Sequence, residues 1–186
     1  MRLALVLAGL GLAALAGCRG LEGVPVVGPT NTDRYTPSSN ALFVGNGQLV
    51  LIGEVVPAET RLRLAQVAAD GIADGAFGTP FRLVPAETAQ IPSRNRVIVV
   101  IGGANQWELC TSQPERGGAF NGQGISISAA ACNGDRRLSS TSGRIGKLEG
   151  VDDPALAYFF TQVGAELFPG RNIDYEPQDR GSSWDF

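Results

Sequence analysis

An uninterrupted run of β-branched residues, Val97-Ile98-Val99-Val100-Ile101, constrains the fold of this 186-residue chain more than any other feature. β-Branched side chains favour extended backbone, and an apolar run without polar alternation is typical of a strand buried on both faces. The sequence therefore predicts a sheet in which residues 96–101 form a strand that is covered on both sides.

Further extended segments are predicted on either side of this strand. Residues 123–132 alternate between two faces, and Asn133-Gly134-Asp135 turns the chain back into a polar strand over 137–145. We expect this hairpin at the edge of the sheet, with its serines facing solvent, where polar side chains oppose edge-to-edge aggregation. The remaining strand predictions are 41–44 and 48–56, joined by a turn at Gly45-Asn46-Gly47, and 81–84.

Two amphipathic helices complete the domain. Pro57 suits the first position of a helix that carries Leu62 on its apolar face, and Asp153-Pro154 reads as an N-cap followed by proline at the first helical position. The apolar seam of the second helix is Leu156, Phe159, Phe160, Val163 and Leu167. Two such helices on one face of a mostly antiparallel sheet predict a two-layer α+β sandwich.

The chain divides into four predicted parts. The first 17 residues form an export leader, with positive Arg2, about 13 apolar residues and a small-residue exit. This apolar run is shorter than the roughly 20 residues that a spanning helix needs. Residues 18–40, rich in Gly, Pro, Ser, Thr and Asn, are expected to form a flexible tether, with a partner-binding segment as the alternative. Residues 41–170 form the globular domain, and 171–186 are a polar tail.

The end of the leader, Leu15-Ala16-Gly17-Cys18, resembles the lipobox of bacterial lipoproteins. The resemblance covers about a tenth of the chain, whose overall layout is similar to small envelope lipoproteins of unknown function. It implies cleavage before Cys18, a diacylglyceryl thioether on that cysteine and an acylated amine, which together anchor a protein stably. Because Arg19 follows in place of the aspartate associated with inner-membrane retention, the resemblance implies the periplasmic side of the outer membrane, with the inner membrane or cell surface as alternatives.

Cys110 and Cys132 then remain as an even pair in an oxidising compartment, where disulfides persist, and we predict that they are bonded. A simple antiparallel pairing of residues 96–101 with 123–132 places Cys132 at the end of the strand pair away from Cys110. The bond therefore requires a chain that doubles back after Gly102-Gly103, or a different strand order. Two separate buried thiols are the alternative.

Composition narrows the function. The chain has no histidine, which removes Ser-His-Asp and Cys-His catalysis and His-ligated metal sites. Cleavage of the leader removes Arg2 and leaves 14 basic against 18 acidic side chains, a net charge of −4, so we expect no nucleic-acid partner. Lys147 is the one lysine, and a Ser-Lys pair with the serines at 126, 128, 139, 140 and 142 is weighed against a solvated turn lysine.

Other candidate residues have simpler explanations. Ile101-Gly102-Gly103-Ala104 lacks the spacing of a phosphate loop, and a turn explains it. Glu54 is either a buried functional carboxylate or a strand-end residue reaching solvent. Asp152-Asp153 lacks EF-hand spacing, and helix capping explains it. The candidate exposed aromatics for partner binding are Trp107, Trp184 and Phe186.

These observations predict a non-enzymatic lipoprotein that contacts the membrane through its lipid alone and acts as a binding or accessory subunit for an envelope protein. No cofactor or metal is expected. The alternatives are a carrier of a small apolar ligand or lipid held between sheet and helices, and a histidine-independent hydrolase of envelope polymers that uses carboxylates or a Ser-Lys pair.

Overall fold

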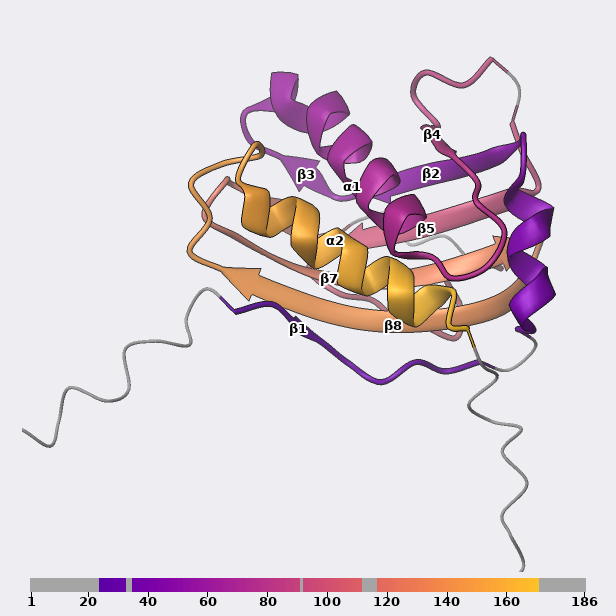
Figure 1. Cartoon of the computed structure of the whole chain (residues 1–186). Coiled ribbons are helices and arrows are strands. Elements are labelled where there is room, and N and C mark those ends of the chain that lie inside the picture. Colours follow the sequence, from indigo (N-terminus) through magenta and orange to yellow (C-terminus); the bar gives the residue numbers. More distant parts are fainter. Residues whose placement is uncertain (1–23, 33–34, 91, 112–116, 171–186) are drawn as a thin grey trace, which may run out of the picture.

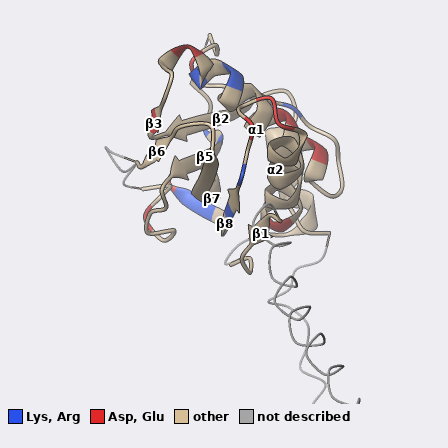
Figure 2. Cartoon of the chain, turned by 90° about the vertical axis from the view of Figure 1, so that its left-hand side faces the viewer, with Lys and Arg blue, Asp and Glu red and all other residues tan. Residues whose placement is uncertain are grey.

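The computed structural model describes residues 24–32, 35–90, 92–111 and 117–170, and these form a two-layer α+β sandwich, as predicted. A six-stranded sheet has the order β1-β8-β7-β5-β2-β4, and helices α1 (Arg61–Gly75) and α2 (Pro154–Leu167) cover one of its faces. Figure 1 shows the two helices side by side above the strands, and Figure 2 shows the two layers end-on.

The sheet is mixed, with antiparallel neighbours in its first half. Strands β1 (Val26–Val27), β8 (Arg136–Gly146), β7 (Gly124–Asn133) and β5 (Asn95–Ile101) pair antiparallel in that order. Strands β2 (Gly47–Ile52) and β4 (Leu83–Pro85) continue the sheet in parallel from β5. A separate parallel pair joins β3 (Glu54–Val55) to β6 (Ala119–Phe120).

The central apolar run behaves as predicted. All five residues from Val97 to Ile101 are buried, and β5 lies between β7 and β2. Its side chains alternate between a large core beneath the helices and a smaller cluster on the opposite face. The absence of polar alternation in this segment therefore correctly predicted that the strand is buried on both faces.

Helix α2 buries the seam expected from its sequence, since Leu156, Phe159, Phe160, Val163 and Leu167 are fully buried. Gly164 packs against α1, and not against the sheet as its position on a sheet-covering helix would suggest. A Cβ at Gly164 would overlap the carbonyl oxygen of Ile72, and one at Gly71 would lie 2.7 Å from the Cβ of Phe160. Glycine therefore permits an unusually close contact between the two helices.

Three local predictions are wrong. Residues 41–43 belong to a 3₁₀ helix, η1 (Pro37–Phe43), which Val44 caps, and β2 pairs with β4 and β5 instead of forming a hairpin with residues 41–44. Helix α1 begins at Arg61, after a short 3₁₀ turn, η2 (Ala58–Thr60), and not at Pro57. Its buried face includes Leu64, whereas Leu62 is 48% exposed. In each case long-range packing overrides a local apolar pattern.

The expected boundary at Asn40 between tether and domain is also wrong for the residues that the structure describes. Val26 and Val27 pair with β8, and the main chains of Asn31 and Ser140 exchange two hydrogen bonds of 2.9 Å. Tyr35 is fully buried. The domain therefore includes the described residues that precede Asn40. The prediction of a linker failed because a Gly- and Pro-rich composition is shared by flexible linkers and by irregular segments that pack onto a fold.

The β7–β8 hairpin forms as expected but is not the sheet edge along its whole length. Strand β7 is central, and β1 with its continuation covers part of β8. Consequently Ser128, Ser139, Ser140 and Thr141 are buried, not solvent-facing. Their hydroxyls bond to the helix layer and to loops, including Ser139 to the Leu167 carbonyl at 2.5 Å and Thr141 to the Gly28 carbonyl at 2.9 Å.

Candidate functional site

A cleft of about 760 Å³ opens at the end of the sheet where β2 and β5 begin. Its walls come from the turn before β2, the loop between β4 and β5, and the end of β7. The described lining residues are Gly45, Asn46, Gly47, Gln48, Val84, Thr88, Ala89, Gln90, Pro92, Ser93, Arg94, Asn95 and Asn133. Amide side chains dominate its polar surface, and we refer to it as the amide cleft.

Three asparagines from three strand ends form a chain of hydrogen bonds along the cleft. Asn95 donates to the Asn46 side chain at 3.1 Å, and Asn133 donates to the Asn95 side chain at 2.6 Å. Asn95 is buried, so its amide needs both partners. This chain uses only part of the bonding capacity of Asn46 and Asn133, since each amide offers two donors and a carbonyl acceptor.

The loop over the cleft is fixed by short-range bonds to the strands. The Ser93 N–H donates to the Gln48 side chain at 2.9 Å, and the Asn95 N–H donates to the Ser93 hydroxyl at 3.0 Å. The Gly134 N–H donates to the Arg94 carbonyl at 2.7 Å, which ties this loop to the β7–β8 turn. A site whose walls are already bonded together loses less entropy when a ligand binds.

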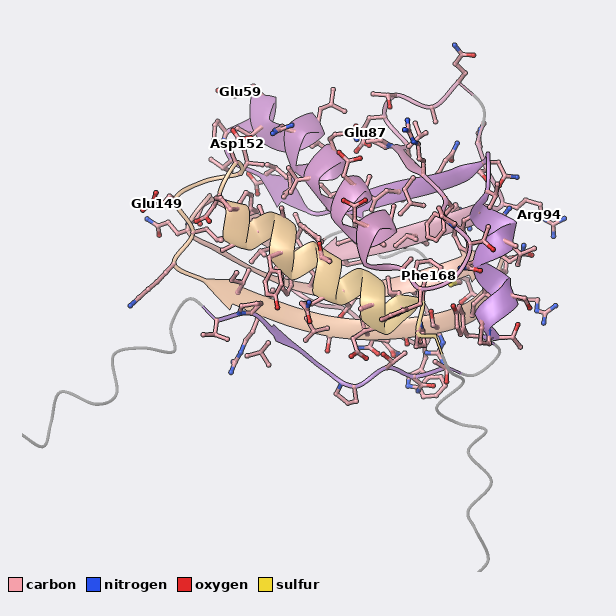
Figure 3. The ribbon with its side chains drawn as sticks, viewed as in Figure 1. Glu59, Glu87, Arg94, Glu149, Asp152 and Phe168 are labelled. Atoms are coloured by element: carbon pink, nitrogen blue, oxygen red, sulfur yellow. A yellow bond between two sulfur atoms is a disulfide. The ribbon has the colours of Figure 1, made fainter. Side chains whose placement is uncertain are left out.

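Arg94 is the one charged residue among the described lining residues of the amide cleft. Its side chain is exposed and is labelled at the right-hand end of the molecule in Figure 3. The guanidinium supplies planar donors that suit a carboxylate or a carbonyl-rich segment. The cleft can therefore hold a neutral or anionic polar group by hydrogen bonds.

A second feature lies on the helix-free face of the sheet. The chain leaves β5 through Gly102 and Gly103, which have φ of 82° and 84°, and folds back over the strands. There Cys110 and Cys132 form a disulfide with Cα atoms 5.7 Å apart, although β5 and β7 pair antiparallel with Arg96 opposite Cys132. The predicted disulfide is confirmed, and of the two possible routes the chain takes the one that doubles back.

This returning segment also carries Trp107, which is 62% exposed, as expected for a candidate contact residue. The Arg137 guanidinium lies over the indole, 3.9 Å from the ring centroid, and donates to the Gln106 carbonyl at 3.2 Å. This cation–π arrangement fixes the ring on the surface. Trp184 and Phe186, the other aromatic candidates, lie outside the described residues.

Three of the five serines considered for a Ser-Lys pair, Ser128, Ser139 and Ser140, are held in structural bonds, whereas Ser126 is exposed and Ser142 is half-buried. Ser128 donates to the Ala104 carbonyl and accepts from the Ala104 N–H, both at 3.0 Å, which closes the turn after Gly102-Gly103. Ser140 bonds to the Gln106 side chain at 3.3 Å. Lys147 is exposed, just beyond β8, with a φ of 54°. The structure therefore shows an exposed turn lysine beyond β8 and three serines committed to other bonds.

The acidic candidates lie at the opposite end of the molecule from the amide cleft, where Figure 3 labels Glu59, Glu149 and Asp152. Glu54 is exposed on β3, in line with the solvent-reaching interpretation. Asp153 caps α2: the Glu149 and Ala155 N–H groups both donate to it at 2.9 Å and hold the pKa of its carboxyl below the ordinary value. Asp152 is not a cap and instead accepts from Arg63 at 2.7 Å.

Two further observations concern the described residues alone. None of their helices is long and apolar enough to cross a membrane. They contain no cluster of three or more carboxylate and thiol ligands that could hold a metal ion. Cys18, the predicted lipid attachment residue, lies outside the described residues and its modification stays a prediction.

Comparisons with known proteins identify no family. No protein-family model and no curated protein matches the sequence. Among solved structures, the chain is similar to a PelC dodecamer from Paraburkholderia phytofirmans, with 9% identity, a TM-score of 0.44 and coverage of 80% of this chain and 100% of that chain. The structure of a point variant of that protein has 9% identity to this chain and a TM-score of 0.43. The match covers 78% of this chain and 99% of that chain. At these scores we draw nothing from the likeness about function or assembly.

Sequence reasoning missed the amide cleft. Asn46, Asn95 and Asn133 are far apart in the chain, and each lies at or next to a strand end, where asparagine is an ordinary turn residue. The available signal was weak: Gln48, Asn95 and Asn133 are polar residues at strand ends in an otherwise apolar sheet. Only strand order brings them together.

Proposed function

We propose that this protein is a non-enzymatic lipoprotein, anchored through Cys18 at the periplasmic side of the outer membrane, that binds an envelope protein partner through the amide cleft. The cleft carries the proposal because it is preformed, roomy and lined by hydrogen-bonding groups with a single charge. Such a surface suits a polar segment of another protein, whose carbonyls and carboxylates can accept from amides and from Arg94.

Export of the domain is supported by the disulfide. Cys110 and Cys132 are 3% and 0% exposed and join the returning loop to β7. Stable disulfides of this kind persist in extracytoplasmic compartments and are rare in the cytosol. This agrees with the leader and the lipobox-like Leu15-Ala16-Gly17-Cys18.

Packing weighs against the carrier alternative. The space between sheet and helices is filled by side chains that are fully buried, among them Leu49, Leu64, Phe159 and Phe160. Protein interiors packed in this way have little room for a guest. The carrier alternative places an apolar ligand in this space, whereas the amide cleft lies outside it.

Three of the five serines weighed for the hydrolase alternative are unsuited to act as its nucleophile, which leaves Ser126 and Ser142 for it. Ser128 and Ser140 are committed to bonds with the returning loop, and Ser139 to the end of α2. A nucleophile needs a hydroxyl that can approach a substrate and a base within hydrogen-bond reach. Substituting Lys147 and Glu54 tests this alternative directly, since loss of function in either variant would favour an enzyme.

The experiment is site-specific photocross-linking in cells. A photoreactive phenylalanine analogue replaces exposed Gln90 in the amide cleft or, as control, exposed Glu59 at the other end of the molecule. We expect one defined protein adduct from position 90, none from position 59, and loss of the adduct in Arg94→Glu. Equal adducts from both positions, or an adduct that survives Arg94→Glu, would overturn the assignment to the cleft.

The anchor is tested separately by mass spectrometry of the amino-terminal peptide of the membrane-purified protein. A diacylated and amine-acylated Cys18 is expected, and Cys18→Ser should leave the precursor unprocessed. An unmodified cysteine would remove the lipoprotein part of the proposal without affecting the cross-linking result.

A further inference from the structure

The place where the chain enters the domain limits how the domain can sit on a membrane. Five residues, 19–23, separate Cys18 from the first described residue, Val24. A fully extended chain spans at most about 3.6 Å per residue, so Val24 lies within roughly 20 Å of an anchor at Cys18. A domain of this length is roughly 35–40 Å across. The anchor reach is therefore shorter than the domain is wide.

The entry point is fixed on one edge of the sheet. Strand β1 runs along the outer side of β8 (Figure 1), with Val26 opposite Arg144 and Val27 opposite Gly143. The Gly28 N–H donates to the Ser142 carbonyl at 2.7 Å, and the Thr141 hydroxyl donates back to the Gly28 carbonyl at 2.9 Å. The anchored end of the domain is thus held by the fold itself, and this edge faces the bilayer first.

The side chains at this edge suit a phospholipid surface. Val24 and Val26 are 50% and 53% exposed, and Arg144, paired with Val26, is also exposed. Directly paired residues point to the same face of a sheet, so Val26 and Arg144 lie together on the helix-free side. No described residue forms an ion pair with Arg144. An apolar pair beside a cation can contact acyl chains and headgroup phosphates together.

We infer that this edge, defined by Val24, Val26 and Arg144, is a membrane-contact surface that takes anionic phospholipid headgroups and fixes the orientation of the domain. The inference rests on the anchor of the proposed function and adds a second, non-covalent contact. It leaves α1 directed away from the bilayer, because α1 packs over β2 and β4 at the opposite side of the sheet.

The test uses the mature chain, residues 18–186, coupled through the Cys18 thiol to a maleimide phospholipid in vesicles. Cys18 is the one reactive cysteine because the other two are disulfide-bonded. A photoreactive residue replaces Val26 or, as matched control, Leu62, an aliphatic side chain on α1 with similar exposure of 48%. We expect cross-links to phospholipid from position 26 and almost none from position 62.

The charge contribution is tested in the same system. Phosphatidylethanolamine–phosphatidylglycerol vesicles are compared with pure phosphatidylcholine vesicles. One basic residue at an anionic surface is worth roughly a fivefold change in affinity, so Arg144→Glu should lower the lipid cross-link at position 26 by about that factor. Arg136→Glu, an exposed arginine at the other end of β8, should leave it unchanged.

Each outcome decides the inference. Equal lipid cross-linking from positions 26 and 62, or none from either, would mean that the domain tumbles freely on its anchor and would overturn it. The anionic-headgroup assignment would be overturned if cross-linking at position 26 were the same in Arg144→Glu as in the wild type and the same in both kinds of vesicle. In this test Cys18 is attached to the lipid by maleimide chemistry, so the result does not depend on whether the cell acylates Cys18. An unmodified Cys18 in cells would contradict the proposed anchor. Equal or absent lipid cross-linking at positions 26 and 62 would contradict only the membrane-contact surface.

Discussion

The two faces of the sheet are stabilised by different means. The helix face is covered by α1 and α2, which bury a large core. A cluster of aromatic side chains near the end of α2 extends this core, namely Tyr35, Phe43, Phe81 and Phe168. On the opposite face a segment without regular secondary structure covers a small cluster formed by Ile98, Val100, Leu109, Cys110, Ala130 and Cys132. A disulfide and the Ser128–Ala104 bonds hold that segment in place.

This difference shows how the same sheet can be closed by burial on one side and by covalent constraint on the other. The described part of this segment, residues 102–111, adds only Leu109, Cys110 and partly buried Ala104 to the apolar cluster, which is little burial for the chain entropy that it loses. A cross-link removes part of that entropy from the unfolded state. The helix face should therefore respond to changes in packing, and the loop face to redox conditions.

The largest effect is expected from Phe168→Ala. The Phe168 ring is fully buried and lies 5.0 Å from Phe81, 5.1 Å from Phe43 and 6.2 Å from Tyr35, between ring centroids. Removing a buried aromatic ring costs about 4 kcal/mol. Urea unfolding of the mature domain measures this loss of stability. Phe77→Ala is the control, because its ring is 57% exposed, and a similar loss there would contradict the account of the helix face.

The loop face is tested by replacing both Cys110 and Cys132 with alanine. A cross-link over a sequence separation of 22 stabilises by about 3 kcal/mol on the chain-entropy model. Amide hydrogen exchange should show faster opening of residues 104–111, while α1 and α2 keep their order of protection. Reduction of the wild-type protein should reproduce the effect. Uniformly faster exchange across both helices would show that the two faces are not independent.

The part of the fold that could be predicted from sequence is the part determined by local pattern and burial. Val97–Ile101 is an uninterrupted apolar run and the seam of α2 has a helical periodicity, and both elements form as expected. The tether prediction failed because residues 26–31 acquire their structure from β8, more than 100 residues later. Composition contains no information about such a partner.

The same reasoning explains what could be predicted about the sites. The disulfide follows from counting cysteines and from the export signal, but the route of the chain between Cys110 and Cys132 does not. The amide cleft was not predictable, because Asn46, Asn95 and Asn133 meet only through the order β7-β5-β2. Residues that are far apart in the sequence form this site only because their strands are neighbours in the sheet.

A smaller effect is expected from Gly164→Ala, which tests the contact between the two helices. The added methyl would overlap the Ile72 carbonyl oxygen, so α1 and α2 must separate. Overpacking of this kind costs about 2 kcal/mol, even though alanine is the better helix former. Gly170→Ala is the control, since its Cβ would lie 3.5 Å from Phe77, an ordinary contact. Equal melting temperatures for the two variants would show that the helices are not closely packed.

The smallest effect concerns Tyr35, which ties the amino-terminal segment to the helix face. Burial raises the pKa of its phenol from 10.0 to about 12, because the charged form is poorly solvated. The folded state therefore holds this proton more tightly than the unfolded state. Its contribution to stability is complete below pH 10 and is lost as the pH rises towards 12.

Thermal unfolding as a function of pH measures this contribution. The fall in melting temperature between pH 10 and about 12 should be shallower in Tyr35→Phe than in the wild type, since phenylalanine cannot ionise. Tyr158→Phe, which alters a tyrosine that is 56% exposed, should retain the wild-type slope. An unchanged slope in Tyr35→Phe would mean that residue 35 meets water in the folded state. The segment that enters from the anchor would then pack more loosely than the remainder of the helix face, and the contrast between the two faces would apply only from η1 onward.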